Sequence, residues 1–215
     1  MKNKQNNEGN ALHIIGYSLL KARAIPLLLL FAAVIITNFL GYNLVLRYFG
    51  YALTVISISL YFIVGLRYRF DKSIIKPSEH VVYFPLAGKV SSIKEIDGKT
   101  RISVQKSVLN NIEIRSPHWL CRWDAGDLII DEIKLQISFT EGNIKIFENE
   151  SFRPGNIIGM AQGKVSYVVQ LNSQQDINLK VGQELKASSS IITMLEYMPE
   201  IEVKDDIILA NEDEE

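Results

Sequence analysis

The residue types in this chain that could carry metal or phosphate chemistry are few and stand apart from one another. His118 and Cys121 have a His-x-x-Cys spacing, but a tetrahedral zinc site takes four ligands and the sequence offers no second pair beside them. Lys164 follows Gly163, but the Gly-x4-Gly-Lys-Ser/Thr frame of a phosphate-binding loop is absent. The sequence therefore predicts a loop around His118 rather than a metal site, and it predicts no cofactor.

The charged residues indicate solvated surfaces. The net charge is −1, but segment 196–215 carries nine acidic residues and one lysine, so we expect an acidic, solvated tail over 199–215. The adjacent carboxylates Asp131 and Glu132 would point to opposite sides of a strand, which does not suit paired acid–base chemistry. The lysines and arginines are dispersed without an interleaved aromatic platform, so the pattern argues against a nucleic-acid partner.

The elements that must position any such side chains begin with an apolar N-terminal region. Segment 24–66 contains one charged residue, Arg47, and divides into uncharged runs of 23 and 19 residues, 24–46 and 48–66. Each run is long enough to cross a hydrocarbon core of ~30 Å as a helix. A secretory signal would instead have one short apolar core and a small-residue cleavage site. We therefore predict a two-helix transmembrane hairpin over 24–69.

Basic residues flank this hairpin. They are Lys21, Arg23, Arg67 and Arg69 at the outer ends, against the single Arg47 in the predicted connection. Because lysine and arginine are retained on the cytoplasmic side, we expect a two-pass protein of the inner membrane with both termini cytoplasmic. Within the N-terminal basic segment 1–23, residues 10–23 place apolar side chains on one helical face. This pattern suits either a helix lying on the membrane surface or an extension of the first span.

The following segment, 70–198, is predicted to be one all-β cytoplasmic domain, a small sandwich or barrel. Apolar and polar residues alternate over 133–139 and again over 144–146, so we predict a hairpin with its turn at Glu141-Gly142-Asn143. Glycines such as Gly163 are interpreted as turn residues, and many short strands are typical of a sandwich or barrel. The other predicted strands are 81–84, 89–96, 101–105, 112–115, 165–171 and 191–195.

Three segments of this domain resemble a known enzyme family. They are YFPLAGKV at 83–90, RISVQKSVLNNIEIRSP at 101–117 and PGNIIGMAQGKV at 154–165. With the apolar hairpin before them, they are similar in order to the small membrane-anchored phosphatidylserine decarboxylases. LKVGQELKA at 179–187 is similar to the closing hairpin of that family. The resemblance spans most of residues 24–195 and implies a decarboxylase-type β domain at a phospholipid membrane.

In that family a serine after glycine cleaves its own chain and becomes a pyruvoyl group, with a histidine and an aspartate in support. The resemblance places the aspartate position on Ala87, the histidine position on Ile112 and the serine position on Lys164. Alanine and isoleucine cannot move a proton, and lysine cannot become a pyruvoyl group. We therefore expect a non-catalytic relative, a pseudoenzyme, whose chain stays whole at 24.4 kDa.

Two alternatives remain open. A displaced nucleophile such as Ser166, with His118 as its base, would make an active pyruvoyl-dependent phosphatidylserine decarboxylase that forms phosphatidylethanolamine. The stretches 84–90 and 181–185 are also similar to the lipoyl-like hairpins of membrane-fusion adaptors. That resemblance implies a periplasmic β domain behind a single span.

The expected role is phospholipid binding or regulation, or a place as a subunit in a membrane protein assembly. Lys72 and Lys76 follow the second span closely enough to lie at the headgroup layer, where each would contribute ~1 kcal/mol to the attraction by anionic lipid. Cys121 is the single cysteine, which fits a reducing cytoplasmic compartment. It also offers a labelling probe for the side of the membrane on which the domain lies.

Overall fold

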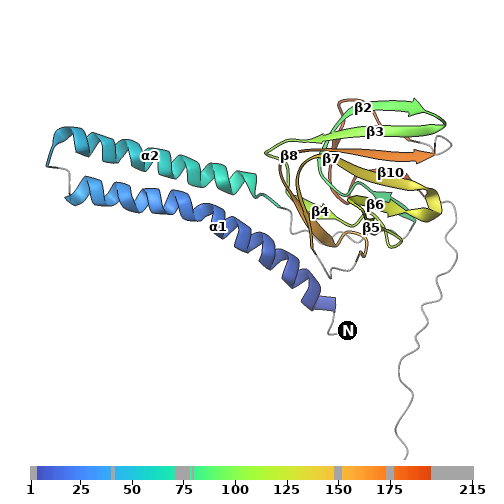
Figure 1. The fold of residues 1–215 in the computed structure, drawn as a ribbon, viewed down its shortest axis with the longest axis horizontal. Helices are drawn as coiled ribbons and strands as arrows, with labels where there is room; N and C mark the ends of the chain where they lie inside the picture. Colours follow the sequence, from blue (N-terminus) through green and yellow to red (C-terminus); the bar gives the residue numbers. More distant parts are fainter. Residues whose placement is uncertain are drawn as a thin grey trace, which may run out of the picture.

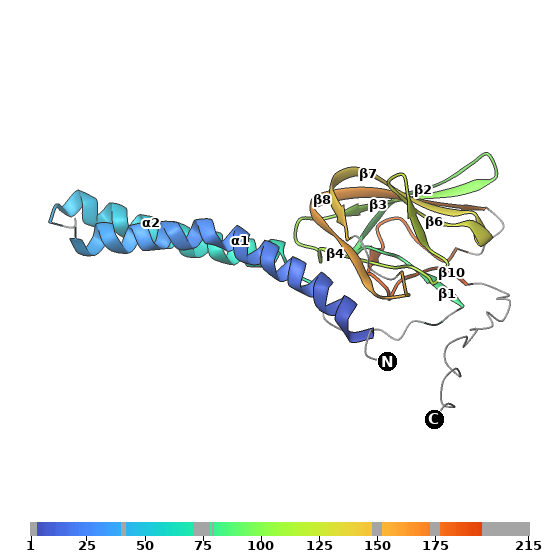
Figure 2. The same ribbon diagram turned by 60° about the horizontal axis from the view of Figure 1, so that its bottom comes forward.

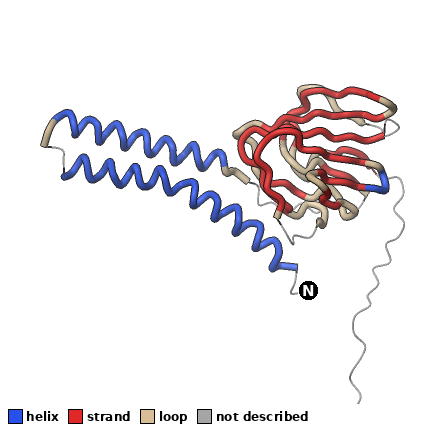
Figure 3. Tube along the Cα trace, viewed as in Figure 1, coloured by secondary structure: helices blue, strands red, loops and turns tan. Residues whose placement is uncertain are grey.

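The computed structural model describes residues 4–39, 42–70, 78, 80–147, 152–172 and 177–194. These residues form two long helices followed by a strand-rich domain, which lies at one end of the helix pair (Figure 1). Figure 3 shows the same division, with the two long helices apart from the strands. The expectation of an apolar helical hairpin followed by a β domain is confirmed.

The two helices run side by side in both ribbon views (Figures 1 and 2). α1 spans Lys4–Phe39 and α2 spans Leu44–Arg67. Asn43 caps α2, because its side chain accepts a hydrogen bond from the backbone N–H of Val45. Arg47 therefore belongs to the first turn of α2, and its predicted place in the connection is wrong. Both helices are long and apolar enough to cross a membrane.

Small residues let the helices approach closely. Gly50 of α2 lies so near Thr37 of α1 that an added Cβ would collide with the Thr37 hydroxyl. Close approach through glycine is typical of helix pairs in membranes, where packing rather than water exclusion drives association. This contact and the neighbouring positions of Arg23 and Gly65 fix the antiparallel register.

The N-terminal part of α1 extends beyond the end of α2 and packs against the β domain. Ala11 and Ile15 are fully buried in an apolar cluster with Ile112, Phe147 and Met160. Segment 10–23 is thus part of one continuous helix, as the second of the two sequence interpretations has it. Ala11 and Ile15 of its apolar face are covered by the β domain.

The β domain is a curled sheet, a half-barrel, accompanied by a two-stranded sheet. The large sheet has the order β5-β6-β7-β8-β3-β2-β9, with β4 pairing off this path to β8, and the small sheet pairs β1 with β10. The strands are β1 Val81–Tyr83, β2 Gly88–Ile96, β3 Lys99–Lys106, β4 Glu113–Arg115, β5 Arg122–Asp124, β6 Asp127–Ile130, β7 Leu135–Ile146, β8 Ile157–Asn172, β9 Glu184–Leu185 and β10 Ile191–Met194, with a short 3-10 helix, η1, at Asp131–Ile133.

β8 is the central strand of the half-barrel. It pairs with β7 along most of its length, with β3 over 165–172, and with β4 near its start. Alternate residues of β8 point into the core and are buried: Val165, Tyr167, Val169 and Leu171. The period-two pattern that predicted this strand is confirmed.

Two predicted turns are wrong. β7 runs straight through Glu141-Gly142-Asn143, where the pairing register with β8 shifts, so these residues form bulges inside one strand. Gly142 and Gly163 take positive φ angles of 113° and 74°, and Gly163 lies inside β8. Both glycines do mark an irregular backbone, but the irregularity bulges and curls long strands rather than reversing the chain.

Candidate functional site

An open apolar pocket lies against the second half of β7. Its volume is about 570 Å³, within the range of about 300–1,000 Å³ that small-molecule sites usually occupy. Among the described residues, its lining includes no charged side chain. The lining residues are Trp123, Gly126, Phe139, Ile144, Ile146, Phe147 and Phe152. Such a lining suits an apolar ligand.

The bulge at Gly142 sets the shape of the pocket. Phe139 and Ile144 are an odd number of residues apart, so regular alternation would place them on opposite faces of β7. The register shifts on either side of Glu141 bring both side chains to the same pocket. An added Cβ at Gly142 would lie 2.7 Å from the carbonyl oxygen of Lys164, so this conformation requires glycine.

The β5–β6 hairpin, which the sequence analysis missed, supplies Trp123 and Gly126. Its two-residue turn, Ala125-Gly126, has positive φ at both positions, 48° and 99°. Positive φ at both central residues is characteristic of the type I′ turn that suits the twist of paired strands. Because strands of three and four residues offer too little alternation to recognise, only this turn could have revealed the hairpin.

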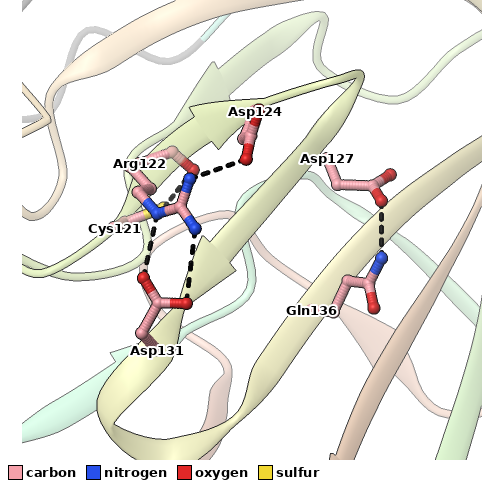
Figure 4. Close-up of polar contacts among 6 residues, drawn as sticks. All are labelled: Cys121, Arg122, Asp124, Asp127, Asp131 and Gln136. Atoms are coloured by element: carbon pink, nitrogen blue, oxygen red, sulfur yellow. Dashed lines mark hydrogen bonds and ion pairs between the residues drawn. The ribbon is translucent and has the colours of Figure 1, made fainter.

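Ion pairs orient this hairpin (Figure 4). Arg122 donates from Nε to Oδ2 of Asp131 at 2.9 Å and from Nη1 to Oδ2 of Asp124 at 2.7 Å. The hydrogen bonds from Arg122 hold the pKa of Asp131 below its usual range. Gln136 of β7 donates to Oδ2 of Asp127 at 2.6 Å, which ties β6 to its neighbour. Because the charged groups are exposed, these contacts fix geometry more than they stabilise the fold.

A row of aromatic rings connects the pocket to the core. The ring centroids of Trp123 and Phe139 are 6.0 Å apart, and those of Phe139 and Tyr167 are 5.8 Å apart. Both separations are favourable for tilted aromatic pairs. Tyr167 is fully buried and donates its hydroxyl to the carbonyl oxygen of Leu86 at 2.7 Å. Burial raises the pKa of Tyr167, so the phenol stays neutral and anchors the inner end of the row.

Phe147 connects the pocket to the helices. Its side chain lines the pocket and also belongs to the apolar cluster that holds Ala11 and Ile15 of α1. The Phe147 N–H donates to the carbonyl oxygen of Ile158 at 2.8 Å, which fixes the end of β7. The pocket therefore lies next to the part of α1 that extends beyond α2.

A buried charged pair lies elsewhere in the domain. Lys106 and Glu113 are 2% and 1% exposed. The Nζ of Lys106 donates to the carbonyl oxygens of Ser107 and Gly163, both at 3.1 Å. Burial lowers the pKa of Lys106 to about 8, and the charge of Glu113 opposes this shift. With its amine bonded to two backbone carbonyls, Lys106 connects β3 to β8 and serves the fold.

The three positions that the family resemblance singled out have different surroundings. Ala87 is buried in the loop before β2, next to Leu86. Ile112 is fully buried in the cluster with α1, and its N–H donates to the carbonyl oxygen of Arg69 at 2.9 Å. Lys164 is exposed on β8. Ala87 and Ile112 therefore contribute to packing, and Lys164 contacts solvent.

Among the other predicted site residues that the structure describes, Ser166 and His118 lie on different elements of the domain. Lys72 and Lys76 lie outside the described residues. Ser166, the displaced nucleophile of the alternative, is within 3.5 Å of the Glu141 carboxylate, across the β7–β8 pairing. His118 lies before β5 and is fully buried.

His118 and Cys121 belong to a buried turn, in agreement with the predicted loop. The N–H of Leu120 donates to Nδ1 of His118, and the N–H of Cys121 donates to the His118 carbonyl oxygen, both at 3.3 Å. Cys121 is 5% exposed, and burial raises the pKa of its thiol to about 12. The thiol is therefore protonated and shielded, so the expected use of Cys121 as a labelling probe is wrong.

Comparison of the chain with protein-family models, with curated proteins and with solved structures finds no match in any of the three. The site itself is therefore the basis for its function. Sequence reasoning did not find the pocket, because its lining joins a hairpin, the bulged part of β7 and Phe152. The one signal that could have found it is the high density of aromatic residues between Trp119 and Phe152.

Proposed function

We propose that the chain is a non-catalytic, membrane-anchored lipid-binding protein whose pocket takes the acyl chain of a single-chain lipid. The observation that carries this proposal is the apolar pocket of about 570 Å³ on a domain that packs directly against an apolar helix of membrane-spanning length. An acyl chain matches the lining because it gains roughly 25 cal/mol for each Å² of apolar surface removed from water.

In this proposal α1 and α2 cross the inner membrane, with both termini and the β domain in the cytoplasm. Exposed basic residues at one end of the hairpin support this orientation: Lys21, Arg67 and Arg69. Exposed tyrosines at the opposite end, Tyr42 and Tyr48, match the preference of aromatic rings for the membrane interface.

The position of the pocket relative to the membrane decides which lipid it can take. Ile15, which meets the β domain, precedes Arg23 by about two helical turns, or ~12 Å along the axis. Because Arg23 lies level with the last turns of α2, the pocket belongs to the aqueous side of the membrane interface. A diacyl lipid held in the bilayer does not extend that far. A fatty acid or lysophospholipid that has left the bilayer can reach the pocket.

The proposal gives no catalytic role to Ala87, Ile112 or Lys164 and needs no pyruvoyl cofactor. Two of these side chains are apolar and buried and the third is exposed, so the proposal places no chemistry on them. Contacts of Lys72 and Lys76 with anionic headgroups remain part of the proposal, because both residues follow α2 in the sequence.

Bromine quenching of tryptophan fluorescence tests the pocket. The chain has two tryptophans, so Trp119→Phe leaves Trp123 as the single emitter. We expect dibrominated stearate to quench Trp123 in a saturable way, and unbrominated oleate to relieve the quenching by competition. The full-length protein in detergent micelles is the sample.

Two variants control this measurement. Trp123→Phe leaves Trp119, which is 42% exposed and does not line the pocket, and it should show only weak, unsaturable quenching. Ile144→Glu places a charge in the apolar lining and should remove the saturable quenching of Trp123 without loss of circular dichroism. Equal quenching of both tryptophans would indicate that the brominated stearate simply partitions into the micelle, and it would contradict the proposal.

A further inference from the structure

Arg23 is held in an unusual place between the two helices. Its guanidinium carbon lies 4.5 Å from the ring centroid of Tyr61 on α2, within the distance of a cation–π contact. An added Cβ at Gly65 would lie 2.9 Å from Nη2 of Arg23. Tyr61 and Gly65 are one helical turn apart, so together they form a seat for the guanidinium on α2.

The hydrogen bonding of this guanidinium is incomplete within the part of the chain that the structure describes. Nε of Arg23 is buried and has no hydrogen-bond partner among the described residues. The sequence contains no aspartate or glutamate between Glu8 and Asp71, so neither membrane-spanning segment can supply a carboxylate. A buried donor without an acceptor, on a charged group, is costly. Arg23 as a whole is half-buried, so an external anion beside its guanidinium would offset part of that cost through its charge.

Arg47, at the other end of the hairpin, provides the contrast. Its Nε donates to the hydroxyl of Tyr51 at 3.2 Å, and its guanidinium carbon lies 6.0 Å from the Tyr51 ring centroid. Both arginines therefore lie within cation–π distance of a tyrosine, but only Arg47 finds an acceptor for Nε in these contacts.

The depth of Arg23 indicates the kind of anion. Gly65 and Tyr61 lie in the last two turns of α2, which ends at Arg67. A helix of 24 residues is ~36 Å long, somewhat more than the hydrocarbon core of ~30 Å. The guanidinium therefore lies at the inner boundary of the core, directly below the phosphate layer. Exposed Lys21, Arg67 and Arg69 add positive potential there.

We propose that Arg23, seated on Tyr61 and Gly65, binds the phosphodiester of an anionic phospholipid in the inner leaflet. The planar guanidinium can donate two parallel hydrogen bonds to phosphate oxygens, which is the strongest common way to recognise this group. The inference rests on the proposed membrane orientation, but it does not depend on the acyl-chain pocket.

Native mass spectrometry of the full-length protein tests this site, with three probes that separate lipid from phosphate. Phosphatidylglycerol presents the phosphodiester on a lipid, diacylglycerol presents the same chains without phosphate, and inorganic phosphate presents the anion alone. We expect one phosphatidylglycerol to bind with preference over diacylglycerol, and phosphate not to displace it. Arg23→Gln should weaken phosphatidylglycerol binding at least about tenfold, because charge-assisted hydrogen bonds are lost.

Arg47→Gln is the matched control, since it removes the same charge from the same hairpin and should leave binding within about twofold. Arg23→Lys keeps the charge without Nε–H or the planar fork, and it should bind more weakly than the wild type. Gly65→Leu keeps Arg23 but fills the space that its guanidinium occupies, so it should also weaken phosphatidylglycerol binding. It replaces Arg23→Gln as the test if Arg23→Gln lowers the helix content.

Equal binding by Arg23→Gln and Arg47→Gln would overturn the proposal, as would equal binding of diacylglycerol or displacement by inorganic phosphate. The quenching of Trp123 by dibrominated stearate is a separate readout. If it fails while Arg23→Gln loses phosphatidylglycerol, the pocket is refuted and the Arg23 site stands. If the quenching is saturable while Arg23→Gln still binds phosphatidylglycerol as well as Arg47→Gln does, only the Arg23 site is refuted.

Discussion

Lys106 shows how a single charged residue can be accommodated inside a small β domain. Two backbone carbonyls accept hydrogen bonds from its amine, and Glu113 lies near enough to oppose the loss of charge. Burial nevertheless dominates and lowers the pKa of Lys106 to about 8. The amine is therefore partly deprotonated just above neutral pH, which makes the stability of the domain depend on pH.

We predict that Lys106 makes the domain more stable as pH rises from about 8 to about 10.4, the pKa of an unperturbed lysine. Below this range the lysine is protonated in both the folded and the unfolded state, and folding bears the full cost of burying its charge. Within it the unfolded chain binds more protons, so alkali favours the folded state. The midpoint of thermal unfolding, followed by tryptophan fluorescence in detergent, measures the effect.

Lys106→Met is the reference for this slope, because methionine has similar length and no titratable group. As pH rises through this range, the unfolding midpoint of the wild type should rise relative to that of Lys106→Met. Parallel curves for the two proteins would show that Lys106 keeps its ordinary pKa in the folded state.

At the scale of secondary structure, the bulges of β7 have the largest consequence for the site. They place Phe139, Ile144 and Ile146 on one surface, and Gly142 makes the conformation possible. A longer strand without bulges would have divided these side chains between the core and solvent. The apolar pocket is thus a property of an irregularity, not of the regular sheet.

We predict that Gly142→Ala destabilises the domain by roughly 2–4 kcal/mol, since its Cβ would overlap the Lys164 carbonyl and the Val165 side chain. Gly98→Ala is the control, with a positive φ of 69° and, among the described residues, no atom within 4 Å of the added Cβ. It should cost only about 1–2 kcal/mol, from left-handed strain. Thermal unfolding of both variants measures the difference.

Gly142→Ala should also weaken the saturable quenching of Trp123 by dibrominated stearate, while Gly98→Ala should not. If the two substitutions cost the same and leave quenching unchanged, the bulge at Gly142 does not shape the pocket.

At the scale of the whole molecule, one long helix joins the proposed membrane part to the β domain. α1 packs on α2 over one part of its length and on the β domain over another. The domain is therefore attached by the chain after α2 and by a second, packed contact at Ala11 and Ile15. This arrangement gives the domain a defined position relative to the hairpin.

We predict that the turn of the hairpin and the β domain lie on opposite sides of the membrane. Since Cys121 is buried, the measurement uses new cysteines in a Cys121→Ala background. Tyr42→Cys, at a position 96% exposed in the turn, should react with a membrane-impermeant maleimide in intact spheroplasts. Lys94→Cys, at an exposed position of β2, should react only after permeabilisation. Reaction of Lys94→Cys in intact spheroplasts would place the domain outside and favour the adaptor alternative.

Local pattern was enough for the features that depend on neighbours along the chain. Uncharged runs on either side of Arg47 predicted two apolar helices, and alternation over 165–171 predicted the second half of β8, because hydropathy and periodicity act within single elements. The family resemblance, also drawn from short segments, stays a hypothesis.

Tertiary structure decided the features that depend on pairing between distant segments. Whether Gly142 would turn the chain or bulge a strand depended on β8, about 20 residues further along. The burial of Cys121, the contact of Ile15 with Ile112, and the seat of Arg23 on Tyr61 and Gly65 likewise depend on partners remote in sequence. A residue's type limits what it can do, but its burial and its hydrogen-bond partners, which decide what it does, are set by the rest of the fold.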